Sequence, residues 1–155
     1  MPDDVEPVDL IAVQTLLSTE AGLCVLSLAR PDGTVSSSLV NAGLLEHPDG
    51  RGPVLGLLAR SSAYKTRRLR RDPRATLTVS RAWQWQAVEG AVSLIGPEDS
   101  HPACPQDALP SLLRAIFVAA GGTHDDWDHF DEVMVSEART ALLLVPRRVY
   151  GIAQR

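Results

Sequence analysis

The sequence predicts a mainly β domain, in which antiparallel strands form a closed or nearly closed barrel decorated by helices. The chain contains six segments with the length and patterning of strands, and Pro-Asp-Gly turns join several of them as hairpins. Strands and helices do not alternate as a Rossmann sheet requires. At 155 residues, with 45% apolar and 22% charged residues, the chain predicts one globular domain spanning 1–155.

The first half of the chain predicts one helix followed by three strands. Asp9 is a suitable N-cap, because an apolar stripe of helical period begins at Leu10. In "RPDGT", between the first two strands, Gly33 tolerates the positive φ that a tight turn requires. "HPDGRG" repeats this turn before the third strand. The three strands are expected at 23–29, 35–45 and 53–59.

The second half predicts three more strands and two helices. The fourth strand, "ATLTVS", alternates apolar and hydroxyl side chains with period two, as a strand with one buried face does. Two segments with helical periodicity separate the fifth strand from the last. The strands are expected at 75–80, 85–96 and 140–152, and the helices at 106–121 and 125–138.

Several classes of protein are disfavoured by composition. No apolar run approaches the about 18 residues that cross a bilayer, and the acidic start "MPDDVEPVD" lacks the features of a signal peptide. We therefore expect a soluble cytoplasmic protein with no membrane partner. Cys24 and Cys104 lie far apart without a metal-ligand spacing, so we expect two reduced, inert thiols.

Residues 60–74, "RSSAYKTRRLRRDPR", concentrate positive charge in a chain whose formal net charge is −4. They hold seven of its fifteen basic residues, among them Lys65, the only lysine. Asp72-Pro73 disfavours helical backbone beyond Arg71, so a short helix is expected between the third and fourth strands.

The start of this short helix has the chemistry of an anion site. Ser61 and Ser62 can cap its free N–H groups, and a helix N-terminus carries partial positive charge. Lys65 follows one turn in, where its ammonium can reach a bound phosphate, and Thr66 and Arg67 add donors. A solvated arginine-rich helix is the alternative. Nucleic-acid binding is a third interpretation, disfavoured by the pI near 5.5 and the lack of a recognisable motif.

A cluster of two histidines and four aspartates at 124–131 has the residue types of a metal site. Thr123 followed by acidic residues is more typical of a helix N-cap and an acidic first turn, so no metal site is expected. No Ser/His/Asp or Cys/His arrangement can be assembled either. The sequence therefore predicts no catalytic side chain.

The order of these elements resembles the split-barrel flavin and deazaflavin oxidoreductases related to pyridoxamine 5'-phosphate oxidase. The resemblance covers nearly the whole chain and is carried by "PDGTVSSSLV", "SSAYKTRRLRRDPRATLTV", "WQWQAVEG", "HDDWDHF" and "LLLVPRRVYGI". The "KTRRLRRDPRA" run and the "DW" element are similar to the actinobacterial branch that binds the deazaflavin coenzyme F420. The resemblance implies a six-stranded split barrel, a homodimer, and a cofactor groove between the subunits.

The resemblance also implies which residues contact the cofactor. Lys65 matches the family's phosphate-binding lysine, and the strand at 35–45 backs the tricyclic ring. Related sequences often carry an arginine two positions before the lysine, where this chain has Ala63; either phosphate affinity is lower here, or Arg60 or Arg67 substitutes. The expected set is Ser37, Ser38 and Val40 behind the ring, Arg60, Ser61, Lys65, Thr66 and Arg67 near the phosphate, and Trp83 and Trp85 from the partner subunit.

The predicted function is that of an F420-dependent oxidoreductase, which transfers a hydride between the deazaflavin and an electron-poor conjugated small molecule. An FMN-dependent oxidase or flavin reductase of the same fold is the first alternative. A cofactor-binding or carrier protein without turnover is the second, because hydride transfer places the chemistry on the cofactor and demands no catalytic side chain. A nucleic-acid-binding protein is the third.

Overall fold

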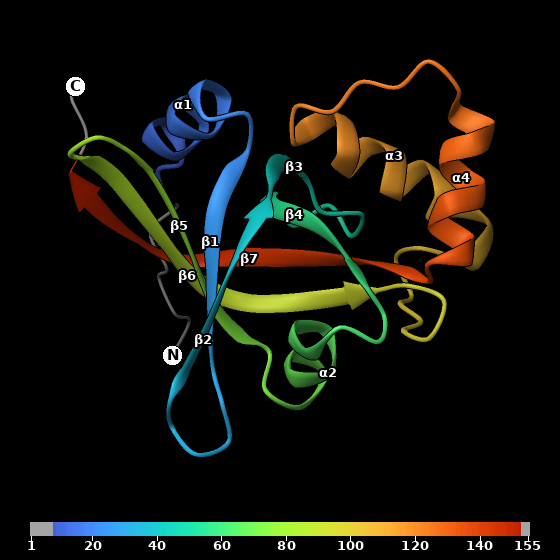
Figure 1. The fold of residues 1–155 in the computed structure, drawn as a ribbon, viewed down its shortest axis with the longest axis horizontal. Coiled ribbons are helices and arrows are strands. Elements are labelled where there is room, and N and C mark those ends of the chain that lie inside the picture. Colours follow the sequence, from blue (N-terminus) through green and yellow to red (C-terminus); the bar gives the residue numbers. More distant parts are fainter. Residues whose placement is uncertain (1–7, 153–155) are drawn as a thin grey trace.

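The computed structural model describes residues 8–152, which form strands, four α-helices and one 3₁₀ turn (Figure 1). The strands are β1 (Leu23–Ala29), β2 (Val35–Asn41), β3 (Gly43–Glu46), β4 (Pro53–Arg60), β5 (Arg74–Arg81), β6 (Gln84–Ile95) and β7 (Arg139–Ile152). The helical elements are α1 (Ile11–Thr19), α2 (Tyr64–Arg71), the 3₁₀ turn η1 (Gln106–Ala108), α3 (Leu109–Ala119) and α4 (Trp127–Ser136).

The strands form one antiparallel sheet in the order β2-β1-β5-β6-β7-β4-β3. Its two edge strands, β2 and β3, are consecutive in the chain and separated by Ala42 alone. Because the chain passes from one edge to the other through a single residue, the sheet must curl until its edges approach each other. The predicted barrel with surrounding helices is therefore confirmed.

The number of strands is corrected from six to seven, because the strand predicted at 35–45 is broken into β2 and β3. Ala42 is fully buried, and its N–H donates to the carbonyl of Gly22 at 2.9 Å rather than to a neighbouring strand. At Gly43, a Cβ would lie 2.1 Å from the carbonyl carbon of Ala119 at the end of α3, so this close packing requires glycine. The break depends on contacts with residues distant in sequence.

One hydrophobic core fills the barrel, and α1 covers one of its ends. Leu26, Leu57 and Leu142 of the strands meet Val13 and Leu16 of α1. The N-cap of α1 is Leu10 rather than the predicted Asp9. Asp9, one residue earlier, still contributes to the start of the helix, because its carboxylate accepts the N–H of Ile11 at 2.9 Å.

A second core lies on the opposite face of β7, where α3 and α4 pack. Ala141 and Leu143 face Ile116 of α3 and Phe130 of α4, whereas Leu142 faces the barrel interior. β7 is thus buried on both faces over this stretch, which explains its continuous apolar run "ALLL". Figure 1 shows α3 and α4 standing to one side of the barrel.

The capping groups of α2 and α4 also differ from those predicted. The residue before α2 is Ala63, and no side chain caps this helix. Ser61 instead lies buried and accepts a hydrogen bond from Arg70, so the prediction that Ser61 and Ser62 cap the helix was wrong. At α4 the cap is Asp126, whose carboxylate accepts the N–H of His129 at 3.1 Å, rather than Thr123.

The two cysteines are free and buried in different cores. Burial raises the pKa of Cys24 to about 12, and that of Cys104 is also raised by burial, which supports the prediction of inert thiols. Over residues 8–152, no helix combines the length and apolar character needed to span a bilayer.

Candidate functional site

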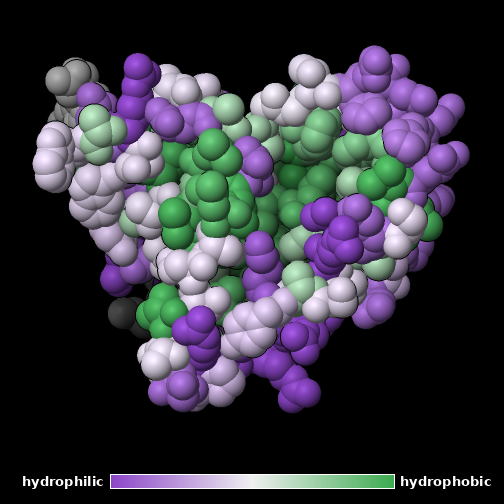
Figure 2. Space-filling model, in the orientation of Figure 1, coloured by the Kyte–Doolittle hydropathy of each residue, from purple (hydrophilic) through white to green (hydrophobic). Residues whose placement is uncertain are grey.

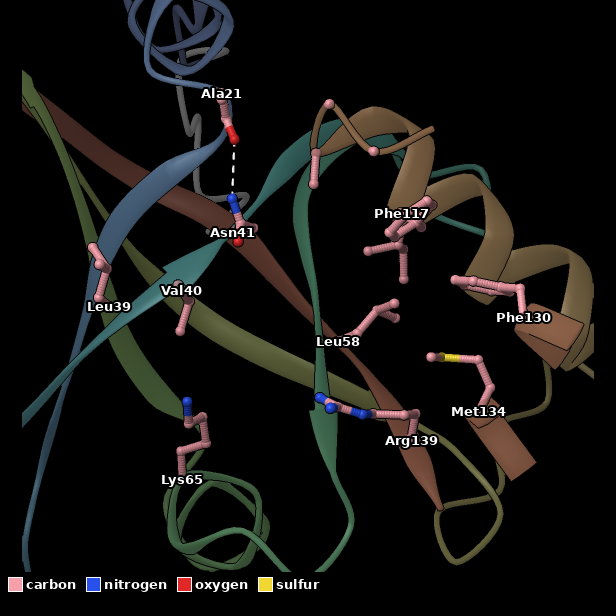
Figure 3. Close-up of a pocket in the computed structure, with 14 residues that line it drawn as sticks. Ala21, Leu39, Val40, Asn41, Leu58, Lys65, Phe117, Phe130, Met134 and Arg139 are labelled. Atoms are coloured by element: carbon pink, nitrogen blue, oxygen red, sulfur yellow. Dashed lines mark hydrogen bonds between the residues drawn. The ribbon is translucent and has the colours of Figure 1, made fainter. Parts of the chain in front are cut away.

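A groove of about 580 Å³ separates the barrel from the α3–α4 arm (Figures 2 and 3). Its volume lies within the about 300–1,000 Å³ of small-molecule sites. On the barrel side, Val40 of β2 and Lys65 of α2 line it; on the other side lie residues of α3 and α4 and the start of β7. The topology explains the hollow, because β2 contacts β4, whereas α3 and α4 pack on the β4–β7 side and do not pack fully on β2.

The helical side of the groove is apolar and aromatic. Phe117, Phe130 and Met134 point into it, together with Leu58 of β4 (Figure 3). The rings of Phe117 and Phe130 are tilted against each other with centroids 4.9 Å apart, and both contact the ring of Trp127 edge-on. This packing holds a rigid apolar wall against which a planar ring can lie.

The polar end of the groove carries two cations, Lys65 and Arg139, which extend into it from opposite sides (Figure 3). The pKa of Lys65 is lowered, first by desolvation of its ammonium and second by the positive charge of Arg139. Over residues 8–152, no acidic side chain neutralises this ammonium. An anion bound between the two groups would remove their repulsion, so this end of the groove is suited to phosphate or carboxylate.

The structure brings together only part of the predicted cofactor set. Val40 and Lys65 both line the groove. Ser38 is half-buried on the same face of β2 as Val40, and so lies along the barrel side. Ser37 is on the opposite face, where its hydroxyl lies 3.0 Å from that of Ser27.

Two of the predicted residues act inside the fold. Thr66 is fully buried and donates to the carbonyl of Arg60 at 2.7 Å. Ser61 is 3% exposed and accepts from the guanidinium of Arg70 at 2.6 Å. These contacts fasten α2 to the end of β4 and thereby fix the backbone that presents Lys65 to the groove.

The two arginines considered as substitutes at the phosphate lie outside the groove lining. Arg60 forms an ion pair with Glu137 at 3.2 Å, and Arg67 is exposed on α2. Neither is among the residues that line the groove.

The two tryptophans lie in different surroundings. Trp83 is in the β5–β6 turn and is 91% exposed, whereas Trp85 is the second residue of β6 and contacts Tyr150 edge-on at 6.0 Å. Neither lines the groove of its own chain.

Sequence reasoning missed Arg139 and the aromatic wall. Arg139 is 74 positions from Lys65, and only the pairing of β4 with β7 brings the two regions together. Phe117 and Phe130 have the spacing of ordinary core residues on amphipathic helices. The one available signal for Arg139 was its place immediately before a buried strand, where charged residues mark the strand end.

No family model matches the chain. The fold is nevertheless shared with solved structures. A conserved hypothetical protein of Mycobacterium tuberculosis aligns with TM-score 0.64 at 18% identity, covering 96% of this chain and 86% of that one. A pyridoxamine 5'-phosphate oxidase-related, FMN-binding protein of Nostoc punctiforme gives 0.65 at 16% identity, covering 93% and 84%. An F420 reductase gives 0.59 at 16% identity, covering 88% and 94%.

These likenesses define the class of fold. The chain has the split-barrel fold of the pyridoxamine 5'-phosphate oxidase-like proteins, and the resemblance drawn from the sequence is confirmed at that level. At this identity the comparisons establish architecture alone.

Proposed function

We propose that the protein is an oxidoreductase that binds coenzyme F420 in this groove and acts on an electron-poor, conjugated small molecule. The observation that carries the proposal is the pairing of an unneutralised Lys65 with Arg139 at one end of a groove whose other wall is aromatic. Such a site provides for an anion and a planar ring at once. When bound, F420 supplies hydride transfer at ring carbon 5.

The residues present fit such a group. Lys65 would hold the phosphodiester, and Val40 and Ser38 would lie behind the ring on the barrel side. Phe117 and Phe130 would exclude water from the opposite side. The chain's own contribution is therefore binding, orientation and exclusion of water, with no catalytic side chain required.

F420 carries a carboxylate tail in addition to its phosphodiester, so the preference for F420 over FMN depends on the basic residues that the fold leaves without a carboxylate partner. Of the seven basic residues at 60–74, four are engaged by carboxylates in the fold. These four are Arg60, Arg68, Arg70 and Arg74. Lys65, Arg67 and Arg71 have no carboxylate partner within residues 8–152, and of these three only Lys65 lines the groove. FMN has one phosphate and no carboxylate tail. The pairing of four arginines with carboxylates therefore favours FMN as the alternative cofactor.

We also propose a homodimer in which a second copy covers the outer face of β1 and β2. Leu23, Val25 and Leu39 are 44%, 37% and 68% exposed there, and Val25 pairs directly with Leu39. Figure 2 shows this apolar patch beside the hollow, and Leu39 also lines the groove. A copy seated on the patch would cover the open side of the groove, where Trp83 and Trp85 of the second copy are expected.

A fluorescence titration of the purified protein with F420 and with FMN tests the proposed function. F420 is expected to bind more tightly. FMN carried stoichiometrically through purification, with no F420 binding, would establish the alternative. Turnover of reduced cofactor with a panel of enones, quinones and tetrapyrroles then separates an enzyme from a carrier, because a carrier binds the cofactor and oxidises none of it.

A further inference from the structure

We infer that Arg139, positioned by Glu137, is the second anion-binding cation of the groove and holds the cofactor phosphate together with Lys65. The inference rests on the proposed function and assigns a role that the sequence left open between Arg60 and Arg67. It concerns the phosphate or phosphodiester that F420 and FMN share as a chemical group.

Position selects Arg139 over the other arginines. Arg139 is the arginine that lines the groove within residues 8–152, and its side chain extends from β7 toward the side of the groove where Lys65 lies (Figure 3). Because Lys65 comes from α2 and Arg139 from β7, the two cations approach an anion from different sides. Desolvation, followed by the positive charge of Arg139, lowers the pKa of Lys65, as expected for two cations that share one end of a groove.

Glu137 fixes the orientation of the Arg139 side chain. The Nε–H of Arg139 donates to one carboxylate oxygen of Glu137 at 2.7 Å. That bond occupies the Nε–H edge of the guanidinium. Its two terminal amino groups form no hydrogen bond within residues 8–152 and are directed to the groove. A planar donor held in this way suits phosphate oxygens.

The backbone beneath Arg139 is also fixed. Ala138, between Glu137 and Arg139, has φ 48°, a left-handed conformation that is uncommon for a residue with a Cβ. Its carbonyl accepts the N–H of Ser61 at 2.9 Å, which fastens the α4–β7 turn to the end of β4. The turn that presents Arg139 and the segment that presents Lys65 are therefore joined directly.

Arg60 binds the same Glu137 carboxylate but lies outside the groove. The second carboxylate oxygen of Glu137 accepts from Arg60 at 3.2 Å, and the Arg60 side chain is 57% exposed outside the groove. The hydrogen bond from Arg139, followed by the charges of Arg139 and Arg60, lowers the pKa of Glu137. The carboxylate therefore remains ionised at neutral pH. Its single negative charge balances one of the two positive charges that Arg139 and Arg60 carry.

The first experiment measures F420 affinity by fluorescence in Arg139→Met, with Arg67→Met as the matched control. Loss of one charge-assisted contact predicts about 10- to 100-fold weaker binding in Arg139→Met. Arg67→Met, which removes the same charge outside the groove, should change the affinity less than about threefold. Equal losses would indicate a diffuse field and overturn the inference, as would unchanged affinity in Arg139→Met.

The second experiment separates the positioning role of Glu137 from its charge. Glu137→Gln and Glu137→Ala remove the same charge, but glutamine retains an oxygen that accepts from Arg139. Glu137→Ala is therefore expected to bind F420 about fivefold or more weakly than Glu137→Gln, roughly the value of one such contact. In an Arg139→Met background the two variants should agree within about twofold. A difference that persists without Arg139 would overturn the positioning role.

The third experiment needs no cofactor. Reductive ¹³C-methylation labels Lys65, the only lysine, together with the N-terminal amine, whose signal is identified as the one that Lys65→Met retains. Inorganic pyrophosphate should shift the Lys65 methyl signal in the wild type, and Arg139→Met should require about tenfold more pyrophosphate for the same shift. If neither F420 nor FMN binds but this dependence is found, the proposed function fails and the paired anion site stands. If F420 binds equally well to Arg139→Met, the proposed function stands and the inference fails. A Lys65 signal that pyrophosphate does not move overturns the inference.

Discussion

Arg70 and Ser61 are joined by two hydrogen bonds, from the guanidinium to the Ser61 hydroxyl at 2.6 Å and to its carbonyl at 3.0 Å. Arg70 also forms a bidentate pair with Asp99, with both contacts at 2.8 Å. This arginine thus ties the last turn of α2 to the end of β4 and to the loop after β6. The basic segment at 60–74 therefore contains a residue that stabilises the fold, Arg70, as well as a candidate anion ligand, Lys65.

We predict that Arg70→Met destabilises the fold. The substitution leaves the buried Ser61 hydroxyl without its donor, which predicts a loss of about 1–3 kcal/mol in the free energy of unfolding. Chemical denaturation measures this loss. The exposed Arg67→Met on the same helix should change stability by less than about 0.5 kcal/mol. Equal effects in the two variants would show that Arg70 is as dispensable as a surface arginine.

Lys65→Met should separate affinity from stability. Loss of the ammonium is expected to weaken F420 binding by about 1.5–3 kcal/mol, the value of a hydrogen bond to a charged group. The cofactor-free protein should keep its melting temperature or gain slightly, because the substitution removes a desolvated charge that Arg139 repels. Titration and thermal unfolding measure the two effects. A melting temperature that falls together with the affinity would assign Lys65 a structural role.

The pH dependence of stability should contain a contribution from Asp72 in the acidic range. Hydrogen bonds from Arg74 lower the pKa of Asp72 from 3.8 to about 2. A carboxyl whose folded pKa is lowered stabilises the fold above its unfolded pKa, and the stabilisation is lost as pH falls through the folded value. The difference in stability between wild type and Asp72→Asn should therefore be constant above pH 4. It should disappear as the pH falls from 4 to 2. Thermal unfolding of both proteins across this pH range measures the difference. If the difference is unchanged at pH 2, the prediction is wrong.

Leu39→Asp should dissociate the proposed dimer and weaken cofactor binding together. Leu39 is 68% exposed in the apolar patch of β1 and β2 and also lines the groove, so a charge there opposes burial against a second copy. Ile11→Asp, at a 75% exposed position on α1, is the matched control. Light scattering at micromolar concentrations measures the mass. A monomeric wild type would contradict the shared groove.

The sequence was most informative where local chemistry decides the structure. The hairpin at Gly33, the hydrogen bond of Asp9 to the start of α1 and the basic helix at 64–71 follow from residue types that act on their immediate neighbours. Lys65 was identified because a single lysine in an arginine-rich helix is chemically distinct. These features require no knowledge of the distant parts of the chain.

The remaining features depend on tertiary packing. The break at Ala42 requires the approach of α3, and Ser61 is diverted from capping because Arg70 reaches it from the far end of the helix. Arg139 joins Lys65 only because β4 and β7 pair. Local pattern carries no information on these contacts, so the second cation could not be chosen from the sequence.

A crystal structure of the protein with F420 would locate the bound cofactor. We expect the cofactor in the groove, with its phosphodiester between Lys65 and Arg139 and its ring between β2 and the wall formed by Phe117 and Phe130. A second hollow, of about 640 Å³, is lined by Arg74, Arg147 and Arg148 on another part of the surface. Cofactor bound in that hollow, with the groove between Lys65 and Phe117 empty, would contradict the account.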